Sequence, residues 1–571
     1  MSGTQVHYEL STRKSASANW SLDLATEDRS LAVSTAHEMM QSGKVVAARV
    51  SKETLDSISR EFQTISILSL GAIEQVKAKK VVEQLEPLCV TPQDLYTLHA
   101  RERIGRLLEA WLERQGATAF ELLHRADLVE TLESSGTDLQ HAIQKVAIPE
   151  AQARGVGVHE LIRSFQALVE RTIERLLKDV RKGVMPDVDK LGFAAAAELV
   201  AKEPERGYLL GAGVAVSIGV ARSWSEKIDR LLDLADVAPV AGPPRALALS
   251  VVEQPLSEIL GSRPGIDAVL GKDIDLGARL AAMTWLAASR SVEALMKIEP
   301  SVARAMPPLT PGAKRLATWL ATEDFQSVRV SIAKRVVREL TGPRRLRPTD
   351  PKGEIEVIRA LAMALTSAAA NLLPLDDVQD AFTIRSKMLV TSDFVEDFLS
   401  GAQSAREEVE NLTWLVENVI GAANKRQAAR YLSAAVGALR FESELRAAYE
   451  SPATRLRHLS ILQKGAARAG LAPEDYKPIQ TKLGEIGGLV EADGKIVAQL
   501  SKGPAASIDR LMLLLQMAVG DAAPLGPAAD RAKAEALRLV RNDETRLELT
   551  KVPERMVKVR GMIQQLTQVA A

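Results

Sequence analysis

The chain has 571 residues, and its 73 lysines and arginines balance its 73 aspartates and glutamates. Hydrophobic residues make up 46% of it, aromatic residues 4%, and there is one cysteine. The composition excludes a largely disordered or fibrous chain, and the length is enough for several buried cores. One cysteine excludes an intramolecular disulfide framework and multi-cysteine metal sites. The zero net charge excludes a molecule that is basic overall and so attracted to nucleic acid or anionic membranes.

The first residues, 1–72, are predicted to form a small α+β module. Alternating or β-branched residues predict strands with one buried face at residues 6–10, 20–25, 46–50 and 60–68. Residues 28–41 predict a helix, which Gly43 would end. The expected order of elements is therefore strand, strand, helix, strand, strand (β-β-α-β-β).

From about residue 73 the hydrophobic period becomes that of α-helices. Apolar residues recur on one helix face over residues 104–112 and again over 161–180. Three helix starts are marked by a hydroxyl residue before proline, because the hydroxyl can cap free N–H groups and proline fits the first turn: Thr91-Pro92, Thr310-Pro311 and Ser451-Pro452. Thr91 with Asp94 resembles a capping box. We expect a mainly α fold, as an irregular helical bundle or a solenoid-like array, without a regular tetratricopeptide or HEAT repeat.

Breaks rich in proline and glycine divide this helical region. The clearest is predicted to be a linker at residues 239–244, and further breaks lie at residues 306–308, 342–351 and 503–504. None is long enough or polar enough to be a disordered tether. The expected helical domains are residues 73–238, 245–341 and 352–502, followed by a C-terminal helical segment, 503–571.

The run from Gly207 to Ala221 is the strongest candidate for a membrane span. It has 15 residues, many of them small, whereas a spanning helix needs about 20 apolar residues. We therefore expect a buried helix and no membrane insertion. The first 14 residues are polar and unlike a signal peptide. With Cys89 as the only thiol, a cytoplasmic protein is expected, and the Ala-, Arg- and Leu-rich composition is typical of a GC-rich bacterium.

Asp376, Asp377 and Asp380 form a DDxxD pattern. It resembles the aspartate-rich motif of the all-helical prenyl-diphosphate and terpene synthases, in which such aspartates hold Mg²⁺ against a diphosphate. Carboxylate oxygens are the ligands that this cation prefers. The resemblance covers five residues, and the second acidic motif of those enzymes is not found. The interpretation that we favour is a helix opened by Leu373-Pro374, whose acidic first turn complements the helix dipole.

Other catalytic patterns are missing from the sequence. The glycines at 211, 213 and 219 lack the spacing and the preceding strand of a dinucleotide fingerprint. The seven histidines include no pair four residues apart, and there is no G-x-S-x-G sequence. We therefore expect a protein that is not an enzyme and has no cofactor.

The strongest local charge lies between residues 326 and 349. Its one acid is Glu339, against seven basic residues, which gives a net +6: Arg329, Lys334, Arg335, Arg338, Arg344, Arg345 and Arg347. Such a cluster suits phosphates, an acidic partner or a small anionic effector. The interpretation that we favour is a solvated helix face and a basic loop, balanced by acids of neighbouring helices. If the helical region has a partner-binding site, we expect it here first.

The leading functional hypothesis is a non-enzymatic cytoplasmic scaffold that binds other proteins or itself through helical surfaces. The alternative is a regulatory binder of a small anionic ligand or nucleic acid through the basic cluster, or through the N-terminal module. Nucleic acid is the less expected ligand, because aromatic residues do not interleave with the basic ones. A remote third hypothesis is a Mg²⁺-dependent diphosphate enzyme that uses the three aspartates.

Overall fold

The computed structural model describes residues 6–14, 21–55, 62–71 and 87–568. The chain divides into two compact units, Met1–Leu88 and Cys89–Ala571. The first unit is a small sheet with one helix and the second is helical, so the predicted mainly α fold class is confirmed. The finer division of the helical region into domains stays a prediction. Residues 20, 60–61 and 73–86, on which parts of the predicted elements fall, lie outside the described residues.

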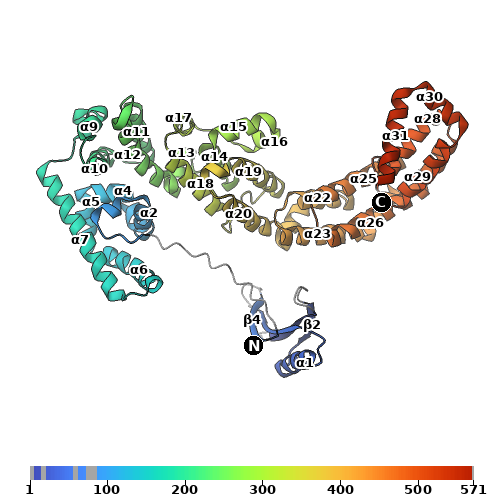
Figure 1. Ribbon diagram of the computed structural model, residues 1–571, viewed down its shortest axis with the longest axis horizontal. Coiled ribbons are helices and arrows are strands. Elements are labelled where there is room, and N and C mark those ends of the chain that lie inside the picture. Colours follow the sequence, from blue (N-terminus) through green and yellow to red (C-terminus); the bar gives the residue numbers. More distant parts are fainter. Residues whose placement is uncertain (1–5, 15–20, 56–61, 72–86, 569–571) are drawn as a thin grey trace. The chain divides into compact units, whose positions relative to one another are not determined.

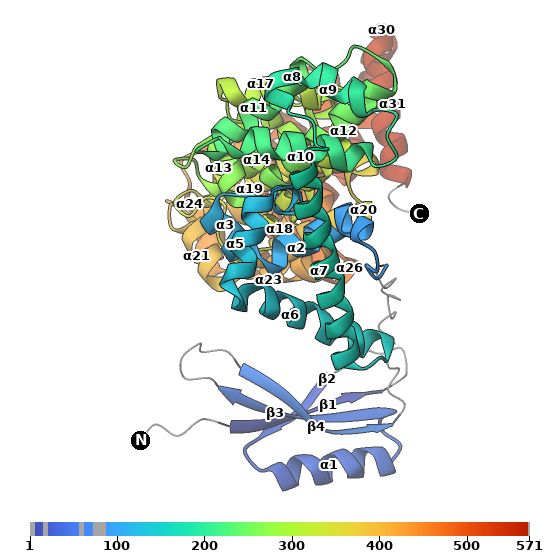
Figure 2. The ribbon, with the colours of Figure 1, turned by 90° about the vertical axis from the view of Figure 1, so that its left-hand side faces the viewer.

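The first unit is an antiparallel sheet covered by a helix on one face. Its elements are β1 (Val6–Arg13), β2 (Ser21–Thr26), α1 (Arg29–Gln41), β3 (Ala47–Leu55) and β4 (Phe62–Gly71). The strand order is β2-β1-β3-β4, and α1 lies along one face of these strands (Figure 2). Between helix and sheet are buried small and aliphatic side chains: Leu10, Ala32, Ala36, Ala48 and Val50.

Local residues set the ends of α1. The carboxylate of Asp28 accepts hydrogen bonds from the backbone N–H groups of Ser30 and Leu31, at 2.7 and 3.3 Å. These N–H groups have no partner within the helix, so the cap stabilises its start. After the helix, Gly43 has φ +66°, a left-handed conformation that glycine adopts without a steric penalty. The helix therefore ends where the sequence predicts.

The second unit is built from helices. Its first part contains η1 (Pro92–Tyr96), α2 (Leu98–Leu107), α3 (Glu109–Gln115), α4 (Ala119–His124), α5 (Ala126–Ser135), α6 (Thr137–Arg154), α7 (Val158–Lys182), α8 (Val188–Leu191), α9 (Phe193–Val200), α10 (Arg206–Gly219), α11 (Trp224–Asp236), α12 (Gly242–Gly261), α13 (Arg263–Leu270), α14 (Leu276–Ala287), α15 (Ser289–Ile298), α16 (Pro300–Ala305), α17 (Pro311–Leu320) and α18 (Gln326–Leu340). Its second part contains α19 (Pro351–Leu372), α20 (Leu375–Met388), α21 (Ser392–Leu399), α22 (Ala405–Asn418), α23 (Ala422–Gly437), α24 (Leu439–Ala447), α25 (Pro452–Arg468), α26 (Pro473–Gly494), α27 (Ile496–Lys502), α28 (Ser507–Ala518), α29 (Pro527–Val540), α30 (Asp543–Lys551) and α31 (Pro553–Gln568).

Two boundaries in this unit differ from the prediction. The helix expected over residues 104–112 is divided into α2 and α3, because the backbone at Leu108 leaves the helical region with φ −108° and ψ 15°. The linker expected at residues 239–244 is shorter, since Gly242 begins α12 and the two prolines that follow occupy its first turn. Proline there costs no hydrogen bond, so this Pro-Pro pair starts a helix instead of separating two.

The predicted helix starts and the predicted buried helix are found. Thr310 Oγ1 accepts a hydrogen bond from the N–H of Ala313 at 3.1 Å, and Ser451 Oγ accepts one from Thr454 at 3.1 Å. The run from Gly207 lies in α10, which is largely buried. Within the described ranges, no helix combines the length and the apolarity of a membrane span.

The second part of the helical unit repeats a group of three helices. The groups are α19–α21, α22–α24, α25–α27 and α28–α30, which begin at residues 351, 405, 452 and 507, about every 50 residues. In each group the first two helices pack against each other, as Figure 1 shows for α22 with α23 and for α25 with α26. The second helices α20, α23, α26 and α29 also pack on their counterparts in adjoining groups.

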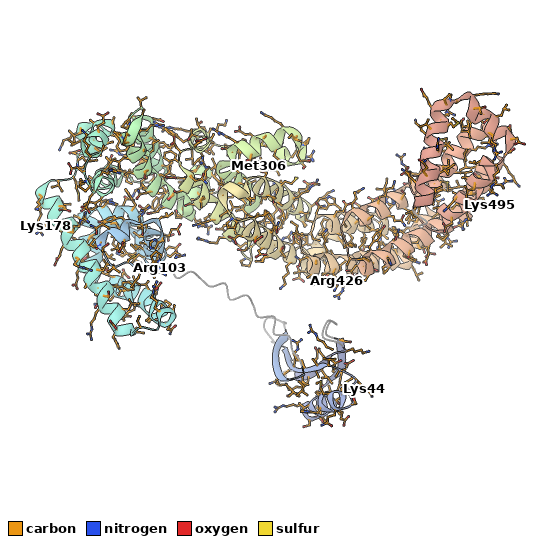
Figure 3. All side chains as sticks on the ribbon, in the orientation of Figure 1. Lys44, Arg103, Lys178, Met306, Arg426 and Lys495 are labelled. Atoms are coloured by element: carbon orange, nitrogen blue, oxygen red, sulfur yellow. The ribbon has the colours of Figure 1, made fainter. Side chains whose placement is uncertain are left out.

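Polar contacts join adjoining groups. Arg426 of α23, labelled in Figure 3, lies 2.8 Å from the Glu474 carboxylate and 3.2 Å from that of Asp475, both on α26. The buried Gln463 of α25 holds the loop before α29, because its Oε1 accepts from the N–H of Leu525 at 2.7 Å and its Nε2 donates to the carbonyl of the same residue at 2.9 Å. On α26, Gly484 gives this loop room, since a Cβ there would overlap the Leu525 carbonyl oxygen.

Candidate functional site

The predicted basic cluster lies on α18 and on the loop that follows it, and the structure separates its members into three places. Arg329 is near the start of α18 and contacts the end of α17. Lys334, Arg335 and Arg338 line a cavity between α18 and helices α2, α3, α12 and α13. The remaining three arginines lie in the loop before α19. The charge of +6 is therefore not one continuous surface.

The loop arginines are balanced by acids of neighbouring helices. Arg345 donates to the Glu354 carboxylate at 2.9 Å and to that of Asp397 at 2.6 Å, and its guanidinium lies 4.7 Å from the centroid of the Phe394 ring. Arg344 donates to Glu339 at 2.8 Å. Arg347 lies 3.7 Å from Asp275 and 3.6 Å from Asp350. These pairs support the interpretation that the loop charges serve the fold.

The acid within the cluster responds to these charges. Burial raises the pKa of Glu339, but the guanidinium groups of Arg335 and Arg344 lower it further, so that it lies below its ordinary value. Arg335 also donates to the carbonyl oxygen of Gly261 at the end of α12, at 3.3 Å. The guanidinium of Arg335 is therefore bound both by the Glu339 carboxylate and by this carbonyl oxygen.

Arginines bind the carbonyl ends of helices in this unit. Arg329 donates to the carbonyl of Leu320 at 2.8 Å, at the end of α17. The fully buried Arg385 of α20 does the same for α18 and the loop after it, where it donates to the carbonyl oxygens of Glu339, Leu340, Gly342 and Arg344 at 3.2, 2.6, 2.9 and 2.9 Å. The last carbonyls of a helix have no partner within it, so a neighbouring guanidinium stabilises them. No local pattern in the sequence distinguishes Arg385, which lies outside the predicted cluster.

The cavity lined by Lys334, Arg335 and Arg338, which we call the α2–α18 cavity, has a volume of about 500 Å³. Lys334 lies 3.2 Å from the carboxylate of Glu102. Arg338 and Arg106 are the cationic side chains of this lining that make no ion pair or hydrogen bond with the described residues. The cavity also takes up acidic side chains from α2, α3 and α12, so its charge is mixed.

Buried ion pairs lie beside the α2–α18 cavity. Arg101 donates to Glu258 at 2.8 Å, and the same carboxylate accepts the N–H of Phe120 at 2.8 Å. Burial raises the pKa of Glu258, although Arg101 counteracts this. Lys227 lies 2.6 Å from Glu121, and burial lowers the pKa of this lysine. These pairs tie α2 and α4 to α11 and α12, so we assign them a role in packing.

His124 is enclosed by aromatic rings close to these pairs. Its ring centroid lies 4.4 Å from that of Phe120, 5.0 Å from that of Tyr96 and 5.8 Å from that of Tyr208. Its Nδ1 is 2.8 Å from the carbonyl oxygen of Phe120. Burial lowers the pKa of His124 to about 4, so the ring is neutral at pH 7 and Nδ1 is the donor. A neutral ring in this position is a packed core residue.

The DDxxD aspartates are exposed on α20. Pro374 precedes the helix, and Asp376 and Asp377 lie in its first turn. Asp380 is on the next turn and is exposed as well. In the part of the chain that the structure describes, no group of three or more His, Cys, Asp or Glu side chains is arranged to hold a metal ion. The positions agree with the acidic first turn that we favour.

A second cavity, which we call the α15–α18 cavity, has a volume of about 460 Å³ and contains Arg329. Its wall includes the starts of α15 and α18 and the ends of α14, α17 and α19. Arg290, which sequence reasoning missed, also lines it. The sequence around Arg290 does not mark it as a cavity residue, because the cavity is formed by segments up to about 80 residues apart in the chain.

Comparisons with known proteins show no relative of this chain. No family model, no curated protein and no solved structure matches it. Its function is therefore inferred from the geometry of its own residues.

Proposed function

We propose that this chain is a solenoid-like scaffold that binds other proteins, or a second copy of itself, through helical surfaces. The observation that carries the proposal is the succession of three-helix groups from α19 to α30. Because each group packs mainly on its neighbours, such an array leaves extended helical faces uncovered, and proteins of this kind use those faces to bind partners. The cytoplasmic location stays a prediction.

The region of α30 and α31 is the surface where we expect a protein contact. Leu547, Met556 and Val557 are exposed by 61%, 46% and 68%, and α30 and α31 both pack on α28 and on each other. Exposed apolar side chains that adjoin one another on a surface are typical of protein interaction sites, and we propose that these three belong to one such patch. Burial of these side chains against a partner would stabilise the complex by the hydrophobic effect.

Light scattering and affinity capture test the scaffold. The mass of the full chain is measured by size-exclusion chromatography with light scattering at several concentrations, and the chain is used as bait in an extract of its own cells. We expect self-association or a retained protein, and we expect the double variant Met556→Glu, Val557→Glu to lose it. The control is Glu554→Gln, an exposed position in the first turn of α31. A monomer at every concentration that also retains no protein would contradict the proposal.

The two other hypotheses find less support. Binding of an anion or nucleic acid through the whole basic cluster requires one surface, whereas its members lie in three places and the loop arginines face acids. The diphosphate enzyme requires further carboxylates close to Asp376, Asp377 and Asp380, and the described residues provide no such group. Both hypotheses stay predictions.

A further inference from the structure

The α15–α18 cavity lies where several helix ends meet. Helices α14, α15, α17, α18 and α19 contact one another in pairs, and Figure 1 shows them side by side. The volume of about 460 Å³ falls within the range of sites for small molecules, about 300–1,000 Å³. This volume is enough for a ligand larger than a single ion.

Positive charge predominates among the side chains that line the α15–α18 cavity. Arg290 and Arg329 are basic and Glu323 is acidic. Arg290 is exposed, and it makes no ion pair or hydrogen bond within the described part of the chain. Arg329 is engaged by carbonyl oxygens of the α17 end and by the amide oxygen of Gln326. Arg329 therefore contributes charge, and Arg290 contributes donors that are free.

The two arginines influence each other. Burial lowers the pKa of Arg329, and the positive charge of Arg290 lowers it as well, while Glu253, Asp324 and Glu323 raise it. The balance leaves this pKa below its ordinary value. An anion held between the two guanidinium groups would relieve their repulsion.

A hydroxyl without a partner among the described residues also lines the α15–α18 cavity. Ser289, the first residue of α15, is only 4% exposed. Its hydroxyl forms no hydrogen bond with any described residue, and its oxygen is not sealed from solvent, so it is available to a ligand in the cavity. The preceding Ala288 provides no side-chain cap for this ten-residue helix. The start of α15 therefore presents a hydroxyl and the positive end of the helix dipole together.

We propose that the α15–α18 cavity binds a phosphate group, free or carried by a small molecule. The guanidinium of Arg290, the hydroxyl of Ser289 and the first N–H groups of α15 donate to the phosphate oxygens. Arg329, on α18, adds positive charge to the same cavity. Leu320 and Leu372, which also line the cavity, contact the uncharged part of a phosphorylated molecule. This site is independent of the protein surfaces in the proposed scaffold.

Calorimetric titration of the full chain tests this site, with inorganic phosphate and AMP as the probes. We expect Arg290→Gln to weaken binding about tenfold or more, about 1.4 kcal/mol, because it removes a charged donor to the phosphate oxygens. Ser289→Ala is expected to weaken it a few-fold. The control Arg338→Gln removes the same charge from another exposed arginine that has no ion pair, and it should bind as the wild type does.

The outcomes distinguish specific binding in this cavity from nonspecific attraction of anions to the positive charges of the protein. Tighter binding of AMP than of phosphate assigns a phosphorylated molecule, and equal binding assigns the free anion; both support the proposal. If neither probe binds the wild type, or if Arg290→Gln and Arg338→Gln weaken binding equally, the proposal is wrong. The thermal unfolding midpoint of each variant confirms folding, and Ser289→Ala provides the test if Arg290→Gln does not fold.

Discussion

Arg385→Met removes the guanidinium that closes the carbonyl end of α18. The side chain is fully buried and donates to four carbonyl oxygens between Glu339 and Arg344, at 2.6 to 3.2 Å. Methionine is long enough to fill most of the space but donates no hydrogen bond. The substitution therefore tests the hydrogen bonds more than the packing.

The cost is set by the carbonyl oxygens that lose their donor. A hydrogen bond to a charged group makes a net contribution of about 1.5–3 kcal/mol to stability. Part of the total from the four hydrogen bonds is offset by the desolvation of the guanidinium. Desolvation is also the largest influence on the pKa of Arg385, which lies below its ordinary value. Since removing one partner of a buried charged interaction usually costs about 3–5 kcal/mol, we expect Arg385→Met to lower the free energy of unfolding by about 3 kcal/mol.

Urea unfolding followed by circular dichroism, together with hydrogen exchange of the peptides around residues 336–346, measures this effect. Arg338→Met is the control, because it makes the same change at an exposed site on α18 and should alter stability by less than about 0.5 kcal/mol. Arg385→Lys keeps the charge but fewer donors, and should fall between the two. Equal urea midpoints and equal exchange for Arg385→Met and Arg338→Met would refute the assigned role.

Three other predictions follow from buried or crowded positions. Between pH 6.5 and about 4 the unfolded chain binds a proton at His124 that the folded chain does not, so the free energy of unfolding should fall by up to about 3 kcal/mol as the pH falls through this range. Urea unfolding of His124→Leu at several pH values should lack this dependence of the unfolding free energy on pH, and equal pH dependence in the wild type and the variant would contradict the prediction. Gly484→Ala forces a Cβ against the Leu525 carbonyl and should lower the free energy of unfolding by about 1–3 kcal/mol. Its control is Gly105→Ala, where a Cβ meets nothing within 4 Å, and this change should raise the free energy of unfolding by about 0.5–1 kcal/mol. Thermal midpoints that rise in both variants would show that the crowding at Gly484 is absent. Asp376→Ala should lower stability by no more than about 1 kcal/mol, and a Mg²⁺-dependent rise in the thermal midpoint that is lost in this variant would instead favour the diphosphate enzyme.

Local signals in the sequence predicted the features that depend on neighbouring residues. The predicted caps Thr310 and Ser451 accept hydrogen bonds from N–H groups three residues away, so a short window contains both partners. Asp28, which the prediction placed inside its helix, is the cap of that helix in the same way. The alternation of apolar and polar residues in the first 70 residues likewise depends on neighbouring positions, because alternate residues of a strand lie on the same face. These features gave the order of elements in the first unit and the helix starts in the second.

Contacts between distant segments were not predictable in the same way. Arg385 binds carbonyls 41 to 46 residues earlier in the chain, and any arginine in an amphipathic helix has the same local pattern. Arg345 reaches Asp397, 52 residues away, so the acids that balance the loop arginines cannot be recognised from the basic segment alone. The three-helix groups also escape a sequence search, because helix packing requires apolar faces of suitable size and not a particular residue at each position.

Basic side chains that bind the carbonyl ends of helices also connect the three-helix groups to one another. Arg455 of α25 donates to the last carbonyls of α24, at 2.7 and 2.8 Å, and Arg510 of α28 donates to the Ser501 carbonyl in α27 at 2.6 Å. Lys425 of α23 binds the carbonyl of Ala469, which follows α25. The groups α22–α24 and α25–α27 thus depend on adjoining groups to complete their own backbone hydrogen bonds. Loss of one group would expose unpaired carbonyls in the next, so unfolding should spread cooperatively along the array, and single groups should not be excisable as independent folding modules.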